Sequence, residues 1–231
     1  MKKRFLAALA TGLLVVGMGG VAQALPTLQI GIEDGYYDGS TETVMVDSDI
    51  FTFYALSDTL DYSPYKIALS LIPNPSLRPD SPAVGDFSVT ASTGVGSSTI
   101  SNWIYGTPDN LPTHDVFPTW YKEIQFAYNG ESLAEPYNVE QDPDGWVAWD
   151  GANFLYSGAF NVDMSGIESG YSLHIDLYST DGITTGKNII FAPFSHDGQG
   201  GGDPVPEPAT MLLFGTGLAG LAGVTRRRKK A

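Results

Sequence analysis

Apolar and polar residues alternate with a period of two in seven separate runs between residues 28 and 177. Successive side chains of an extended strand point to opposite faces, so each run is expected to bury one face and expose the other to water. No convincing helical repeat separates the runs. The pattern predicts seven or eight strands, whose apolar positions are Leu28, Ile30 and Ile32; Phe51, Phe53 and Ala55; Ile67, Leu69 and Leu71; Phe87, Val89 and Ala91; Ile124, Phe126 and Tyr128; Phe160, Val162 and Met164; and Leu173, Ile175 and Leu177.

Turn-forming residues separate these runs and favour the same fold class. Gly, Asn and Asp adopt the backbone conformations that tight turns need. Residues 73–82 and 106–120 are rich in proline. Proline has no backbone N–H to donate to a neighbouring strand, so both stretches are expected to be long loops rather than central strands. The chain is therefore predicted to be all-β, an antiparallel β-sandwich whose topology, jelly-roll or immunoglobulin-like, the pattern leaves open. The turn clusters are residues 33–35, 37–39, 129–130, 144–145, 150–151 and 181–182.

Residues 1–24 are typical of a secretory signal peptide and are expected to form a helix outside the sandwich. Three cations open the segment, an apolar stretch follows, and Ala22 and Ala24 form a small-x-small cleavage site. We expect export through the Sec translocon and cleavage after Ala24. The rest of the chain would then begin outside the cytoplasm.

The C-terminal end has three parts: a proline-flanked glutamate, an uncharged stretch over residues 209–224, and a basic cluster. The sixteen helical residues of the uncharged stretch would reach about 24 Å, slightly short of a hydrocarbon core of roughly 30 Å. We expect a transmembrane helix whose basic end stays in the cytoplasm as a stop. The motif is Val205-Pro206-Glu207-Pro208, and the basic cluster is Arg226, Arg227, Arg228, Lys229 and Lys230.

Formal charge is unevenly distributed along the chain. Residues 25–204 hold 25 carboxylates and 4 Lys or Arg side chains, a net charge of −21. Nucleic-acid binding needs clustered cations that neutralise phosphates, so nucleic acid is not an expected partner. The same charge argues against adhesion to an anionic lipid surface. Cysteine is absent, so stability must come from a packed core or bound metal rather than disulfides.

The C-terminal end resembles the PEP-CTERM sorting signal of Gram-negative bacteria: Pro-Glu-Pro, then Ala209-Thr210-Met211-Leu212-Leu213, a glycine-rich apolar helix and terminal arginines. The resemblance implies an exosortase, a membrane protease-transpeptidase, as the partner that removes the tail. It also implies transient residence in the inner membrane, then the cell surface or extracellular matrix, in association with exopolysaccharide and biofilm. The body resembles "choice-of-anchor" surface proteins, a family without a known activity, through its ending Phe191-Ala192-Pro193-Phe194-Ser195-His196-Asp197.

These features divide the chain into four expected parts. Residues 1–24 are the signal peptide, residues 25–198 the β-sandwich domain, and residues 205–231 the sorting signal. Residues 199–204 contain three consecutive glycines and are expected to be a flexible linker.

Acidic residues crowd one predicted loop, and Ca²⁺ is the one cofactor that the sequence suggests. Hard cations take several oxygen ligands from a chain that turns sharply. The first candidate set is Glu140, Asp142, Asp144 and Asp150; Asp34 with Asp38, and Asp47 with Asp49, are further candidates. Asp and Gly also dominate turns for backbone reasons alone, and we favour that interpretation.

The four tryptophans lie in or beside turn-rich segments. Flat aromatic faces in exposed loops can stack on sugar rings, although a tryptophan in a sandwich is more often part of the core. The candidate glycan-binding residues are Trp103, Trp120, Trp146 and Trp149.

Enzymatic chemistry finds little support in the sequence. The histidines are His114, His174 and His196, and His174 shares a polar strand face with Ser172, Asp176 and Tyr178, so we expect it to be solvated. Neither GxSxG nor HExxH occurs. We therefore expect no catalytic residues and a non-enzymatic surface or matrix protein. Because 25 carboxylates make some acid pair inevitable, a carbohydrate-active hydrolase stays open, as does a calcium-dependent glycan-binding module.

Overall fold

The computed structural model describes residues 27–75, 79–109, 111, 114–142, 148, 150–179, 190–193 and 196–201. The expected signal peptide with Ala22 and Ala24, the expected sorting motif, the basic cluster and both expected terminal helices lie outside these residues. No helix in the described part of the chain has the length and apolar character needed to cross a bilayer.

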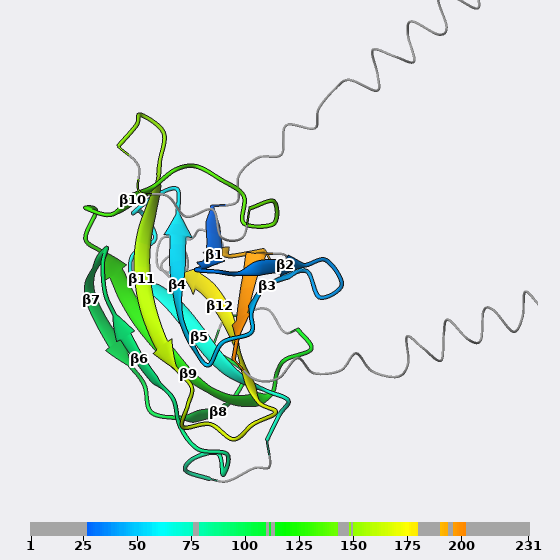
Figure 1. Cartoon of the computed structure of the whole chain (residues 1–231). Coiled ribbons are helices and arrows are strands. Elements are labelled where there is room, and N and C mark those ends of the chain that lie inside the picture. The colour runs from blue at the N-terminus through cyan, green and yellow to red at the C-terminus, as the bar shows by residue number, and fades with distance from the viewer. Residues whose placement is uncertain are drawn as a thin grey trace, which may run out of the picture.

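Two β-sheets form the body, and β4 and β11 lie in front of β5 and β9 in Figure 1. The smaller sheet has five strands in the order β1-β4-β11-β10, with β6 also paired to β11. All of these pairs are antiparallel. The strands are β1 (Leu28–Ile32), β4 (Ile50–Ser57), β6 (Ser88–Ala91), β10 (Leu133–Ala134) and β11 (Leu155–Asp163).

The larger sheet has nine strands in the order β2-β3-β14-β12-β5-β9-β7, with β13 paired to β12 and β8 to β9. Its pairs are antiparallel except β14 with β3, which is parallel. The strands are β2 (Tyr36–Asp38), β3 (Thr43–Val46), β5 (Tyr65–Ile72), β7 (Val95–Ile100), β8 (Ile104–Gly106), β9 (Thr119–Tyr128), β12 (Ser172–Ser179), β13 (Ile190–Phe191) and β14 (Asp197–Gly200).

The all-β sandwich predicted from the sequence is confirmed, and each of the seven alternating runs corresponds to a strand: β1, β4, β5, β6, β9, β11 and β12. The strands that the pattern did not predict are mostly short or rich in small polar residues, as in the Val-Gly-Ser-Ser-Thr-Ile sequence of β7. Such segments carry few apolar side chains, so alternation has little signal there. All of them except β10 belong to the larger sheet.

The core lies between the two sheets, where aromatic rings meet. Phe160 on β11 stacks on Phe53 of β4 with centroids 5.2 Å apart, and its edge meets Phe126 of β9 at 5.1 Å. All three side chains are at most 2% exposed. Burying a large apolar side chain contributes about 1.5–3 kcal/mol, so this core is the main source of stability in a domain without disulfides.

The expected linker begins too early and needs correction. Gln199 and Gly200 belong to β14, between β3 and β12, rather than to a flexible segment. A Cβ at Gly200 would lie 2.2 Å from the Phe51 ring, and one at Gly198 would lie 2.7 Å from Ile30. These glycines therefore allow the strand to pack closely over the core, a use of glycine that composition does not distinguish from flexibility.

Candidate functional site

The outer face of β12 is buried, which corrects the expectation that His174 is solvated. His174 is 7% exposed and Asp176 is 2% exposed. The segment between β8 and β9, residues 107–118, supplies Leu111 and Phe117, which pack against apolar side chains of this face. Alternation predicts which residues share a face, but it does not reveal that a loop will cover them.

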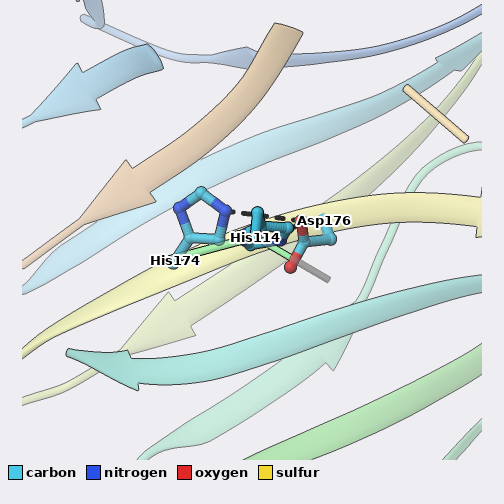
Figure 2. Close-up of side chains that lie close together, drawn as sticks. All are labelled: His114, His174 and Asp176. Atoms are coloured by element: carbon cyan, nitrogen blue, oxygen red, sulfur yellow. Dashed lines mark hydrogen bonds and ion pairs between the residues drawn. The ribbon is translucent and has the colours of Figure 1, made fainter. Parts of the chain in front are cut away.

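His114 comes from this covering loop and meets His174 and Asp176, which lie two residues apart on one face of β12. His114 Nε2 is 3.0 Å from Asp176 Oδ1, and His174 Nε2 is 3.3 Å from the same oxygen. One nitrogen or oxygen atom from each residue lies within 4.8 Å of the others. Figure 2 shows the three side chains converging on one point.

Buried polar atoms without hydrogen-bond partners surround this point. His174 Nε2 and Asp176 Oδ2 have none, because the 3.3 Å contact between His174 and Asp176 lacks hydrogen-bond geometry. Ser70 on β5 faces His174 in the sheet register, and its buried Oγ also has no partner. Each unsatisfied buried polar group costs about 1–3 kcal/mol, so their concentration at one place is unusual for a purely structural cluster.

A second carboxylate adjoins the cluster. Asp197 on β14 is 3% exposed, and its Oδ2 lies 3.8 Å from His174 Nε2. Burial and the charge of Asp176 raise the pKa of Asp197 well above its usual value. Burial also acts to raise the pKa of Asp176, but the electrostatic effect of His174 and the hydrogen bond with His114 outweigh it and hold that pKa below its usual value.

The described lysines form ion pairs with carboxylates outside the histidine cluster. Lys66 Nζ lies 2.7 Å from Glu123 Oε1, and Lys122 Nζ lies 2.6 Å from Asp86 Oδ1. Within the described residues, the basic side chains beside Asp176 are therefore the two imidazoles and not a lysine.

The chemistry open to this cluster is metal ligation rather than nucleophilic catalysis. Two imidazoles and a carboxylate form a ligand set that suits zinc and related transition metals. Ser70 is fully buried, and His174 directs Nε2 toward Asp176, so these residues do not form the relay that activates a serine for attack on an external substrate.

The predicted acidic loop is not gathered into a comparable group. Glu140, Asp142 and Asp150 are exposed, and Asp144 lies outside the described residues. Asn138 organises the turn by accepting hydrogen bonds from the backbone N–H groups of Glu140 and Asp142. Among the described residues, His114, His174 and Asp176 are the one set of three or more His, Asp or Glu side chains whose candidate ligand atoms converge.

The other acidic pairs have local partners. Asp38 Oδ1 accepts hydrogen bonds from the backbone and hydroxyl of Ser40, which lower the pKa of Asp38. Asp34 adopts a positive φ of 58° in the turn after β1. Asp47 accepts a 3.0 Å hydrogen bond from Tyr36, and with Asp49 it lines a cavity of about 240 Å³. Asp38 thus stabilises a turn, as the backbone interpretation expects.

The structure places two of the four tryptophans. Trp120 is 1% exposed and contacts Tyr105 in a T-shaped arrangement, so it is buried and does not offer a face for stacking on a sugar. Trp103 is half-buried; it contacts Phe87 edge-on, and Lys122 Nζ lies 5.0 Å from its ring. Trp146 and Trp149 lie outside the described residues.

The sequence contained a partial signal for the histidine cluster. The His174-x-Asp176 spacing on a strand places both side chains on one face. His114 lies 62 residues before Asp176 in a proline-rich stretch, and no local pattern connects the two segments.

Comparison with known proteins identifies the C-terminal end. A family model described as the PEP-CTERM protein-sorting motif matches residues 204–229. No curated protein matches the chain. The family match covers the C-terminal end and does not extend into the sandwich. The chain therefore carries the sorting signal of PEP-CTERM proteins, which marks it as an exported protein that an exosortase sorts to the surface of a Gram-negative cell.

Proposed function

We propose that this protein is a non-enzymatic component of the cell surface or extracellular matrix, associated with the exopolysaccharide of a biofilm. The observation that carries the proposal is the sorting motif at residues 204–229, which follows almost directly on a sandwich domain ending with β14 at Gly200. The tail is the signal that directs the sandwich domain to its destination. The domain passes through the inner membrane and is released from it by exosortase cleavage near Pro208.

Several features of the body support a role in adhesion or scaffolding over catalysis. His174 lies under the loop that carries His114, and the neighbouring Ser70 is fully buried. A body with a net charge of −21 repels other anionic polymers and stays soluble outside the cell. Recognition of a glycan would then depend on aromatic loop residues, for which Trp103, Trp146 and Trp149 remain candidates.

Glu207→Ala tests the sorting step in the native host, with Glu135→Ala as an exposed acidic control in the body. Intact mass and cell fraction are measured for each chain, with and without the exosortase. Wild type and Glu135→Ala should begin at Leu25, end near Pro208 and leave the inner membrane. Glu207→Ala should remain there with its tail intact. Normal release of Glu207→Ala, or retention of the wild-type tail, would contradict the proposal.

A second experiment separates the proposed role from the alternatives. Purified protein is incubated with exopolysaccharide from the host, and both sedimentation with the polymer and release of reducing ends are measured. We expect co-sedimentation without cleavage, unchanged by a calcium chelator. Release of reducing ends would identify a hydrolase. Loss of co-sedimentation after chelation that added Ca²⁺, but not Zn²⁺, restores would identify a calcium-dependent glycan-binding module.

A further inference from the structure

We propose that His114, His174 and Asp176 bind a divalent transition-metal ion of the zinc class, which fastens the segment between β8 and β9 to the outer face of the larger sheet. This site differs from the acidic loop around Glu140 in its residues and in its ligand chemistry. The inference is independent of the proposed function, because metal binding by the purified chain does not depend on where the cell delivers it.

The geometry of the cluster is close to that of a formed metal site. Ligand atoms about 2.0–2.2 Å from a tetrahedral ion lie roughly 3.3–3.6 Å from one another. The distances of 3.0 Å from His114 Nε2 and 3.3 Å from His174 Nε2 to Asp176 Oδ1 are near this spacing. All candidate ligand atoms lie within 4.8 Å, so small side-chain rotations are enough to close the site. His174 and Asp176 are already placed by β12, a central strand of the sheet.

The unsatisfied atoms provide an independent indication of a ligand. His174 Nε2 and Asp176 Oδ2 are buried without hydrogen-bond partners, and both belong to the functional groups that ligate metals. An ion bound between them gives each group a partner. It also supplies the positive charge that the described lysines do not bring to Asp176, because Lys66 and Lys122 pair with Glu123 and Asp86.

The donor types select the class of ion. Two imidazole nitrogens favour zinc and neighbouring transition metals, whereas Ca²⁺ and Mg²⁺ require mainly oxygen ligands. Asp197, with Oδ2 3.8 Å from His174 Nε2, is the nearest side chain for a fourth ligand. Two neutral imidazoles, two carboxylates and a dication would form a neutral buried unit, which removes the cost of placing isolated charges away from water.

The site would act as a cross-link in a chain that has no cysteine. His114 and Asp176 are 62 positions apart, and the segment containing His114 covers β12 through apolar contacts of Leu111 and Phe117. A metal bond between this segment and the sheet restrains a long chain loop, as a disulfide does in other exported proteins.

The test uses the full chain purified without a histidine tag. The protein is stripped with a chelator and dialysed, then titrated with Zn²⁺ and separately with Ca²⁺; bound metal, affinity and Tm are measured. Substitutions are His114→Gln, His174→Gln and Asp176→Asn. His196→Gln is the matched control, because His196 is also buried but bonds to Asn138 outside the cluster.

Wild type and His196→Gln should bind one Zn²⁺ per chain with a higher Tm, and Ca²⁺ should not compete. Each cluster substitution should weaken Zn²⁺ binding by at least about 100-fold. When Co²⁺ replaces Zn²⁺, wild type should show the visible absorption of a tetrahedral site with nitrogen and oxygen ligands. The variants His114→Gln, His174→Gln and Asp176→Asn should not show it.

Limited proteolysis within residues 107–118 should become faster when the metal is removed. Failure of the wild-type chain to bind micromolar Zn²⁺ would overturn the proposal. Equal Zn²⁺ affinity in His114→Gln and wild type would also overturn it. Because His114 lies on a covering loop, the His114→Gln variant stays informative if a substitution in β12 prevents folding.

Discussion

The hydroxyl of Tyr178 on β12 donates a hydrogen bond of 2.5 Å to Glu123 Oε2 on β9. The strand between them is β5, and its Lys66 contacts the other carboxylate oxygen of Glu123 at 2.7 Å. Three neighbouring strands are thus joined by one carboxylate, through two bonds that involve a charged acceptor.

Tyr178→Phe should therefore lower the free energy of unfolding by about 1.5–3 kcal/mol, the range for a hydrogen bond to a charged group. Tyr36→Phe is the control, because Tyr36 is 44% exposed and bonds to Asp47 at the surface; it should cost no more than about 0.5 kcal/mol. Chemical denaturation of both variants measures the difference, and equal losses would contradict the importance of the buried bond.

Stability should decline at alkaline pH. Burial, followed by the hydrogen bond to Glu123, raises the pKa of Tyr178 far above the usual tyrosine value. A raised pKa means that the folded state holds the phenolic proton more tightly than the unfolded state does. Its contribution is complete below about pH 10 and is lost as pH rises beyond that value.

Unfolding free energies measured from pH 8 to 12 should therefore fall above pH 10, with a shallower fall in Tyr178→Phe. Burial also raises the pKa of Tyr65, Tyr121 and Tyr128, so the variant should keep part of the slope. An unchanged slope in Tyr178→Phe would contradict the assignment to this residue.

Gly200→Ala should destabilise the domain by about 1–3 kcal/mol through overpacking. Its added Cβ would meet the Phe51 ring at 2.2 Å. Gly39→Ala is a matched change in an exposed turn, where an added Cβ meets no atom within 4 Å. Thermal unfolding of the pair tests whether β14 is a packed strand; similar Tm values would support the original linker prediction.

Phe160→Ala should cost about 3–5 kcal/mol, because its ring contacts Phe53 in its own sheet and Phe126 in the other. Ile50→Ala, at a position 66% exposed on the neighbouring strand, should change stability by about 0.5 kcal/mol or less. Denaturant unfolding of both variants measures the difference, and equal losses would contradict the place of Phe160 in the core.

The strands with strong alternation were predictable, and those made of small polar residues were not. Leu173, Ile175 and Leu177 mark β12 clearly because one face needs apolar side chains for the core. In β14, Gly198 and Gly200 occupy the core-facing positions where bulkier residues would clash with Ile30 and Phe51. A strand packed through glycine leaves no hydrophobic period in the sequence.

Two of the three residues of the histidine cluster could be grouped from the sequence, and the third could not. His174 and Asp176 share a face by strand geometry, which sequence spacing supplies. Their burial depends on Leu111 and Phe117, and their third partner is His114, all from a segment whose path over the sheet is set by tertiary packing. Local patterns carry no information about that path.

The position of β14 links maturation to the order in which the chain leaves the cytoplasm. This strand lies between β3 and β12, so β2 and β3 join the rest of the sheet only after residue 200 has emerged. From Gly201 to Glu207 a fully extended chain reaches at most about 21 Å. If the domain folds before an exosortase acts at Glu207, the protease would work within this distance of Gly201, and bulk added near β14 should slow cleavage more than bulk added elsewhere.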